Sequence, residues 1–233
     1  MAGHKALAAT EKPERGSKMK LHLGCGQVYL EGCVNIDYPL TEHTVQQTSV
    51  ADEFHDLTNM RYKARGIEEV RLHHVFEHFP RAQAIALLAS WHSWLEKGGK
   101  VHIEVPEFDA TTEIFFNPKA SSKDRHVAIR HLFGSNEAAW AVHYDGWNEW
   151  RFRELFEAFG FKMEKVSRNE YLATRNIEVV ARKNKKTPPK DKIIDIARKY
   201  LGQFTVNDSE FENRLLEIWL EDFKSQLKRT IAR

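Results

Sequence analysis

The sequence predicts an α/β fold: a Rossmann-like three-layer sandwich with a mainly parallel sheet and an antiparallel last strand, followed by C-terminal helices. Two observations lead to this prediction. Short apolar segments alternate with helical segments over most of the chain, which is typical of parallel strands joined by helical crossovers. The last two strand-like segments lie too close together for such a crossover, which favours antiparallel pairing. The chain of 233 residues, 42% of them hydrophobic, can bury one core and carry an extension.

Six segments have the apolar character of short strands and are bounded by glycine, proline or charged residues. They cover residues 19–23, 33–36, 70–74, 100–105, 161–166 and 176–181. The last two are expected to form the antiparallel pair. No obvious strand precedes Asp56.

Two helices are expected between these strands. Pro80 begins the first, and its apolar stripe over 82–95 ends before a pair of glycines. The second covers 148–159 and ends at Gly160. The intervening segment 108–133 also has helical content.

Composition divides the chain into four parts. Residues 1–18 are polar and lack the apolar centre of a secretory signal, so we expect a flexible leader. The strands and helices of residues 19–183 form the main domain. A basic, proline-containing linker follows at 184–190, and residues 191–233 are expected to form a helical tail.

Charge and cysteine content argue against several classes of protein. The net charge of +2 is spread over interspersed acidic and basic residues, which gives no reason to expect a nucleic-acid partner. No run of about 20 apolar residues is present, so no membrane span is expected. Two cysteines give no disulfide framework, and we therefore expect a cytoplasmic protein.

The most informative motif is a glycine turn between the first two strands. Gly24, Cys25 and Gly26 follow the first strand, and Asp37 follows the second. In open α/β sheets, ligands bind at the carboxyl ends of strands, where glycine lets the main chain approach closely. A carboxylate at the next strand end can accept hydrogen bonds from both hydroxyls of a ribose. The motif therefore predicts a nucleoside-containing cofactor, the alternative being that the glycines only make a turn.

The same segment is a poor match to a dinucleotide site. Tyr29 occupies the place of the third glycine in the G-x-G-x-x-G pattern, and Asp37 arrives early. The crossover between residues 23 and 34 is also too short for a full helix. We therefore do not expect NAD.

A second cluster of polar residues follows the third strand. His73, His74, Glu77 and His78 place four titratable groups within six residues, which raises the possibility of a metal site. However, His73 and His74 are adjacent on a strand and point to opposite faces, so they seldom converge on one ion. We expect no metal here.

Five segments together resemble the successive motifs of class I S-adenosylmethionine-dependent methyltransferases. They are KLHLGCG, GCVNID, the HDL of residues 55–57, HHVFEHFP, and LEKGGKVHIEVPEF at 95–108. The resemblance covers about residues 18–183 and is narrower for a branch of bacterial enzymes that act in surface-glycan (polysaccharide) and small-molecule biosynthesis. It implies S-adenosylmethionine as cofactor and methyl transfer to a small-molecule or glycan acceptor.

The resemblance also implies roles for individual residues. Gly24, Cys25 and Gly26 would line the methionine and ribose part of the cofactor, and Asp37 would hold the ribose hydroxyls. Four further residues complete the expected site: Asp56 and Leu57 beside the adenine, and His74 and Glu77 beside the sulfonium and the acceptor.

The aromatic segment 140–150 is expected to close over the reacting atoms. His143 is the side chain in it best suited to take a proton, since its unperturbed pKa is near 6.5. Glu77 and His78 are the other candidates for the base. A base is needed for a hydroxyl acceptor more than for an amine, so we expect an oxygen acceptor. Trp147 and Trp150 are expected to be core residues at a helix start.

Two other functions remain open at this point. The chain could be a non-catalytic or scaffold protein of the same fold, or an aminopropyl-type transferase, because fold does not determine function.

The last helix of the tail has a broad apolar stripe that includes Leu216, Trp219 and Phe223. Such a stripe must be buried against its own domain, a second copy or another protein, and we expect a homodimer or a partner protein to cover it.

Overall fold

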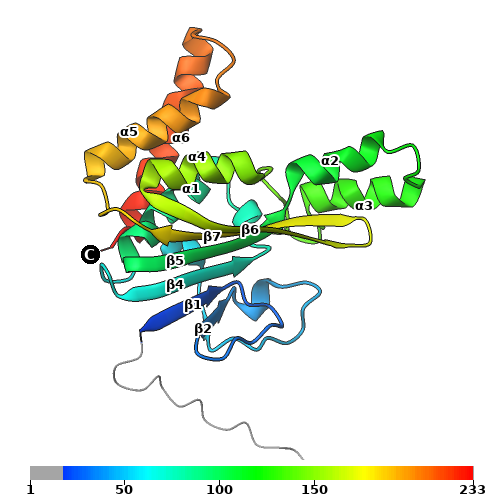
Figure 1. Ribbon diagram of the computed structural model, residues 1–233, viewed down its shortest axis with the longest axis horizontal. Coiled ribbons are helices and arrows are strands. Elements are labelled where there is room, and N and C mark those ends of the chain that lie inside the picture. The colour runs from blue at the N-terminus through cyan, green and yellow to red at the C-terminus, as the bar shows by residue number, and fades with distance from the viewer. Residues whose placement is uncertain (1–17, 233) are drawn as a thin grey trace, which may run out of the picture.

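The computed structural model describes residues 18–232 and builds them around a seven-stranded sheet of order β3-β2-β1-β4-β5-β7-β6 (Figure 1). The expected leader, apart from Lys18, lies outside the described residues. The strands are β1 (Met19–Leu23), β2 (Val34–Asp37), β3 (Glu53–Phe54), β4 (Ile67–His73), β5 (Leu95–Pro106), β6 (Phe161–Tyr171) and β7 (Thr174–Lys183).

The pairing confirms the predicted Rossmann-like sheet. Strands β1 to β5 are parallel to one another, and β7 runs antiparallel to both β5 and β6. The crossover from β1 to β2 contains turns but no helix, as its length predicted. The strand missing before Asp56 is β3, which has only two residues, both exposed, and therefore leaves no apolar pattern in the sequence.

Six α-helices accompany the sheet within the described residues. They are α1 (Arg81–Trp94), α2 (Phe108–Phe116), α3 (Ser122–Phe133), α4 (Glu149–Phe159), α5 (Lys190–Leu201) and α6 (Glu210–Thr230). Helix α1 is buried on nearly all sides because it lies between the sheet and α6. At the start of α4, Trp147 is fully buried as expected. Trp150 is 58% exposed, so its placement in the core was wrong.

The C-terminal helices fold back onto the main domain. Leu220, Phe223 and Leu227 of α6 are fully buried and belong to the same core cluster as the sheet residues. The contact with α1 includes a hydrogen bond from Trp94 Nε1 to the carbonyl oxygen of Thr230, at 2.8 Å. This half of the apolar stripe is therefore covered by the chain itself.

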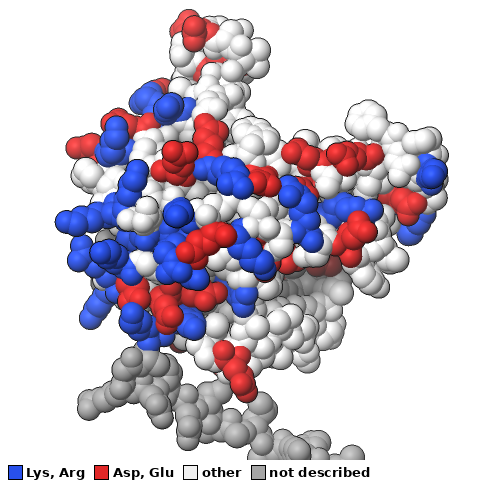
Figure 2. Space-filling model, viewed as in Figure 1, with Lys and Arg blue, Asp and Glu red and all other residues white. Residues whose placement is uncertain are grey.

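The surface carries mixed charge. Lys and Arg are interspersed with Asp and Glu over the face shown in Figure 2. Several of the cations are paired: Lys100 Nζ lies 3.1 Å from Glu164, and Lys165 Nζ lies 2.7 Å from Glu178. No helix within residues 18–232 combines the length and apolar character that a membrane crossing requires.

Burial of the tail predicts a clear difference between two positions of α6. Phe223→Ala should lower the free energy of unfolding by about 3 to 5 kcal/mol, because it leaves a cavity under α1. Phe211→Ala should change it by no more than about 0.5 kcal/mol, since Phe211 is 73% exposed. Urea unfolding of both variants checks this, and equal effects would show that α6 does not pack as described.

Candidate functional site

A cavity of about 930 Å³ opens at the carboxyl ends of the first parallel strands. This is the usual place for a ligand in an open α/β sheet, and the volume is within the range of small-molecule sites. Seven of the predicted residues line it: Gly24, Gly26, Asp37, Asp56, Leu57, His74 and His78. The predicted residues that do not line it are Cys25, Glu77 and His143.

Gly24 and Gly26 shape one wall of the cavity through main-chain geometry. Both have positive φ, +65° and +54°, which disfavours other residues. A Cβ on Gly24 would overlap Val75 Cγ2, whereas one on Gly26 would meet only Gln46 Oε1, at 3.8 Å. Gly24 is therefore required by close packing, and Gly26 leaves the cavity open.

Cys25 contributes to this turn through its backbone. Its N–H donates to the carbonyl oxygen of Ile36 at 3.0 Å and so ties the turn to β2. Its side chain is buried, and burial raises the pKa of the thiol to about 11. At neutral pH this thiol is protonated and unreactive.

Asp37 is held in a fixed orientation at the end of β2. Its Oδ1 accepts from the N–H of Tyr38 at 2.9 Å, and its Oδ2 accepts from Gln46 Nε2 at 3.1 Å and from Ser49 Oγ at 3.3 Å. The carboxylate is 4% exposed and faces the cavity. These bonds leave one acceptor site free on Oδ1, and a ligand hydroxyl can reach Oδ2 in place of Gln46 or Ser49.

Asp56 has a structural role that the sequence did not reveal. It caps the short 3-10 turn Leu57–Asn59, with its Oδ1 accepting from the N–H of Thr58 at 2.8 Å and its Oδ2 from Asn59 Nδ2 at 2.8 Å. Both Asp56 and Leu57 still line the cavity. Because Oδ1 also accepts from Thr58 Oγ1 at 2.7 Å, the cap fixes the carboxylate and leaves free acceptor capacity on Oδ2.

His74 lies between two carboxylates. Its Nδ1 is 3.4 Å from Glu77 Oε1, and its Nε2 is 3.4 Å from Glu104 Oε1. Partial burial alone would lower the pKa of His74, but the two carboxylates outweigh it and raise the pKa to about 10. His74 is therefore an imidazolium at neutral pH, which makes it unsuited to act as a base or as a metal ligand.

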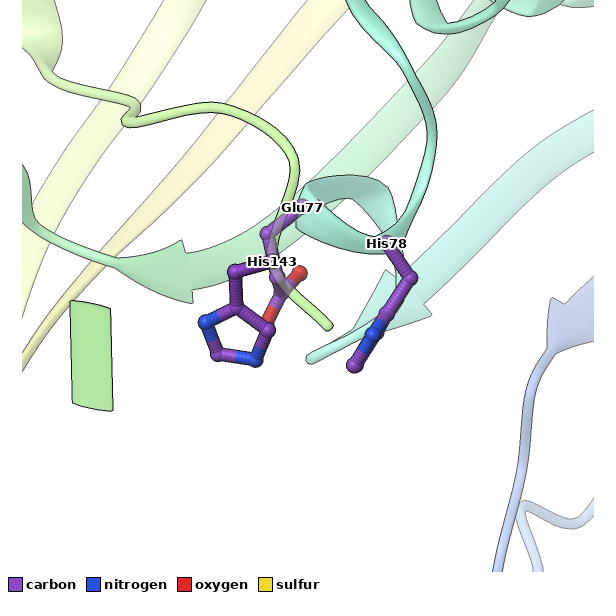
Figure 3. A group of neighbouring side chains, drawn as sticks. All are labelled: Glu77, His78 and His143. Atoms are coloured by element: carbon purple, nitrogen blue, oxygen red, sulfur yellow. The ribbon is translucent and has the colours of Figure 1, made fainter. Parts of the chain in front are cut away.

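Glu77, His78 and His143 form a cluster beside the cavity (Figure 3). Glu77 and His78 come from the 3-10 turn after β4, and His143 comes from the loop between α3 and α4. His143 Nε2 lies 4.0 Å from Glu77 Oε1, and the rings of His78 and His143 are 4.7 Å apart between centroids. The three predicted candidates for the base thus lie together, and only His78 lines the cavity.

The charge states of this cluster follow from burial and neighbours. Burial lowers the pKa of His143 below its usual 6.5, so its imidazole is neutral at pH 7. Burial opposes ionisation of Glu77, but His74, with smaller contributions from His78 and His143, holds the pKa of its carboxyl below the usual value. A carboxylate and a neutral imidazole are therefore available as proton acceptors.

Contacts of the aromatic segment 140–150 that the sequence did not predict complete the site. Trp140 Nε1 donates to the carbonyl oxygen of Glu42 at 2.7 Å and so joins two loops at the cavity wall. Asp145 accepts from Arg81 at 3.1 Å and from Arg151 at 2.9 Å, which anchors the segment after His143. These contacts link segments far apart in the sequence, so no local sequence pattern predicts them.

Comparison with known proteins supports the fold. No family model matches the chain, and no curated protein matches it. One similar structure is a chain in a complex between the Haloferax volcanii Trm112 methyltransferase activator and a candidate methyltransferase. The aligned region covers 76% of this chain and 86% of that chain, at 12% identity and a TM-score of 0.51. For a SAM-dependent methyltransferase from Archaeoglobus fulgidus the shares are 72% and 87%, at 14% identity and a TM-score of 0.48. At these identities, only the fold is established.

The close contact at Gly24 predicts a specific pattern of stability. Gly24→Ala should lower the free energy of unfolding by about 1 to 3 kcal/mol more than Gly32→Ala. Gly32 also has positive φ, +76°, but a Cβ there meets nothing within 4 Å, so it controls for backbone strain. Adding Val75→Ala to Gly24→Ala should recover part of the loss. Equal effects in urea unfolding for the two glycine variants would contradict the packing described.

Proposed function

We propose that this chain is an S-adenosylmethionine-dependent methyltransferase that acts on an oxygen of a small-molecule or glycan acceptor in surface-polysaccharide or small-molecule biosynthesis. One observation carries the proposal. The glycine turn after β1 and the carboxylate of Asp37 at the end of β2 face one cavity, at the place where this fold binds ligands. The motif order in the sequence and the shared fold support the same conclusion.

The residues present fit this cofactor. Asp37 would accept from the ribose hydroxyls, and the open main chain at Gly26 would face the methionine part. Asp56 and Leu57 would lie beside the adenine. When bound, the cofactor supplies a methyl group activated by a sulfonium.

The charge of the opposite wall also fits a sulfonium. His74 is one cation placed between two carboxylates, Glu77 and Glu104, so the group as a whole is negative. Hydrogen bonding to His74 lowers the pKa of Glu104, and both carboxylates are ionised at neutral pH. A positively charged ligand is therefore favoured at this wall over a neutral one.

Proton removal from an acceptor hydroxyl falls to the cluster of Glu77, His78 and His143. His78 lines the cavity and is the first of the three that an acceptor would meet. The neutral imidazole of His143 and the carboxylate of Glu77 lie behind it. A base this near favours an oxygen acceptor, because an amine can release its proton to water.

We also propose a cytoplasmic location and a homodimer. The two thiols, both free, suit a cytoplasmic protein. For a homodimer, the part of α6 left uncovered is its first half, where Phe211 and Ile218 are exposed.

Titration with S-adenosylhomocysteine tests the proposal. Asp37→Asn should weaken binding by about 1 to 3 kcal/mol, because the ribose hydroxyls lose a charged acceptor. Glu53→Gln, an exposed carboxylate on the neighbouring strand, is the matched control and should bind as the parent does. Calorimetry measures all three proteins. A parent protein that fails to bind would overturn the proposed function, and an unchanged Asp37→Asn would overturn the assignment of Asp37.

A further inference from the structure

The cluster of Glu77, His78 and His143 has the composition of a metal site as well as that of a proton acceptor. One oxygen of Glu77 and one ring nitrogen from each histidine all lie within 4.8 Å of one another. The backbone holds them there, because the N–H of Tyr144 donates to the carbonyl oxygen of Glu77 at 2.9 Å. Figure 3 shows the three side chains pointing toward a common space.

Glu77 gives the first indication that this cluster binds a ligand. It is 1% exposed, and among the described residues neither of its carboxylate oxygens has a hydrogen-bond partner. The nearest cation, His74, lies at 3.4 Å and is shared with Glu104. The ion pair with His74 leaves the other lone pairs of this buried carboxylate unfilled, so its position is best explained by a ligand that it binds.

The two histidines are oriented as metal ligands usually are. Nδ1 of His143 lies 3.0 Å from the carbonyl oxygen of His131, and Nδ1 of His78 lies 3.2 Å from that of Val142. A carbonyl oxygen only accepts, so Nδ1 of each ring carries a hydrogen and Nε2 is the nitrogen that can bind a metal. Histidines that bind metals through one nitrogen almost always donate from the other in this way.

We propose that Glu77, His78 and His143 bind one divalent transition-metal ion. Two imidazoles and one carboxylate suit Zn²⁺, Fe²⁺ or Co²⁺, whereas Mg²⁺ and Ca²⁺ prefer oxygen ligands alone. Three protein ligands also leave a coordination position open, as in catalytic metal sites. Because His78 lines the cavity, that position is open to ligands from the cavity.

Only small movements are needed to form this site. Ligands about 2.0 to 2.2 Å from a tetrahedral ion are about 3.3 Å apart. His143 Nε2 and Glu77 Oε1 are 4.0 Å apart, and the ligand atoms of all three residues lie within 4.8 Å of one another, so side-chain shifts of up to about 1.5 Å bring them into range. Glu77 and His78 belong to the cluster in which no metal was expected from the sequence, and His143, from a distant loop, takes the place of His73 and His74 as the third ligand.

A bound ion would change how the acceptor loses its proton. A hydroxyl on the open position would have its pKa lowered by coordination, so its proton could pass to solvent water without a side chain to accept it. This last step rests on the proposed function, whereas the metal site does not.

Cobalt titration of the full chain tests the proposal. After treatment with a chelator, the protein should bind one Co²⁺ per chain, with visible d–d absorption that Zn²⁺ removes and Mg²⁺ does not. Glu77→Gln, His78→Ala and His143→Ala should each weaken Co²⁺ binding at least about 100-fold, more than changes to residues that contact a ligand but not the metal. His126→Ala, an exposed histidine of α3, is the matched control and should bind as the parent does.

Two results would overturn the proposal: no stoichiometric Co²⁺ binding by the parent, or binding unchanged in the three variants. Circular dichroism identifies a variant that fails to fold, and His78→Asn and His143→Asn then replace the alanine variants. S-adenosylhomocysteine titration without metal reads the cofactor site separately, so failure of one proposal is distinguishable from failure of the other.

Discussion

Close packing of Gly24 against Val75 is the contact on which the candidate site depends. It brings the turn after β1 against the loop that leaves β4, with no space for a side chain at Gly24. Gly24 lies two residues before Gly26, whose main chain lines the cavity. Val75 directly precedes the 3-10 turn that contains His78. One contact between the segments that follow the adjacent parallel strands β1 and β4 therefore positions both the glycine turn and the turn that contains His78.

Buried charge determines which ligands the wall that contains His74 and His78 favours. Glu77 is buried with His74 on one side and with His78 and His143 on the other, and all three lie close enough to lower the pKa of its carboxyl. A sulfonium and a metal ion are both cations, so this one buried carboxylate favours both proposed ligands. Its cost to folding is offset by the histidines and, under our proposal, by the ion.

Local motifs could be predicted from the sequence, and long-range contacts could not. Gly24, Gly26 and Asp37 were found because a strand, a glycine turn and a strand-end carboxylate lie within a short segment. Strand β3 was missed because two exposed residues carry no periodicity.

The remaining misses share a physical cause: they depend on tertiary contacts. The apolar stripe of α6 predicted burial correctly, but the sequence did not show that α1 covers its second half. Trp150 was placed in the core on its residue type, although its side of α4 faces solvent. The ion pairs of Asp145 with Arg81 and Arg151 join three positions whose spacing in the sequence does not predict a contact.

A crystal structure of the complex with S-adenosylhomocysteine tests the central claim most directly. We expect both ribose hydroxyls within hydrogen-bond distance of the Asp37 carboxylate, the adenine beside Leu57, and the sulfur facing the wall that contains His74 and His78. A nucleoside bound elsewhere on the chain, or bound in this cavity with its ribose away from Asp37, would contradict the account.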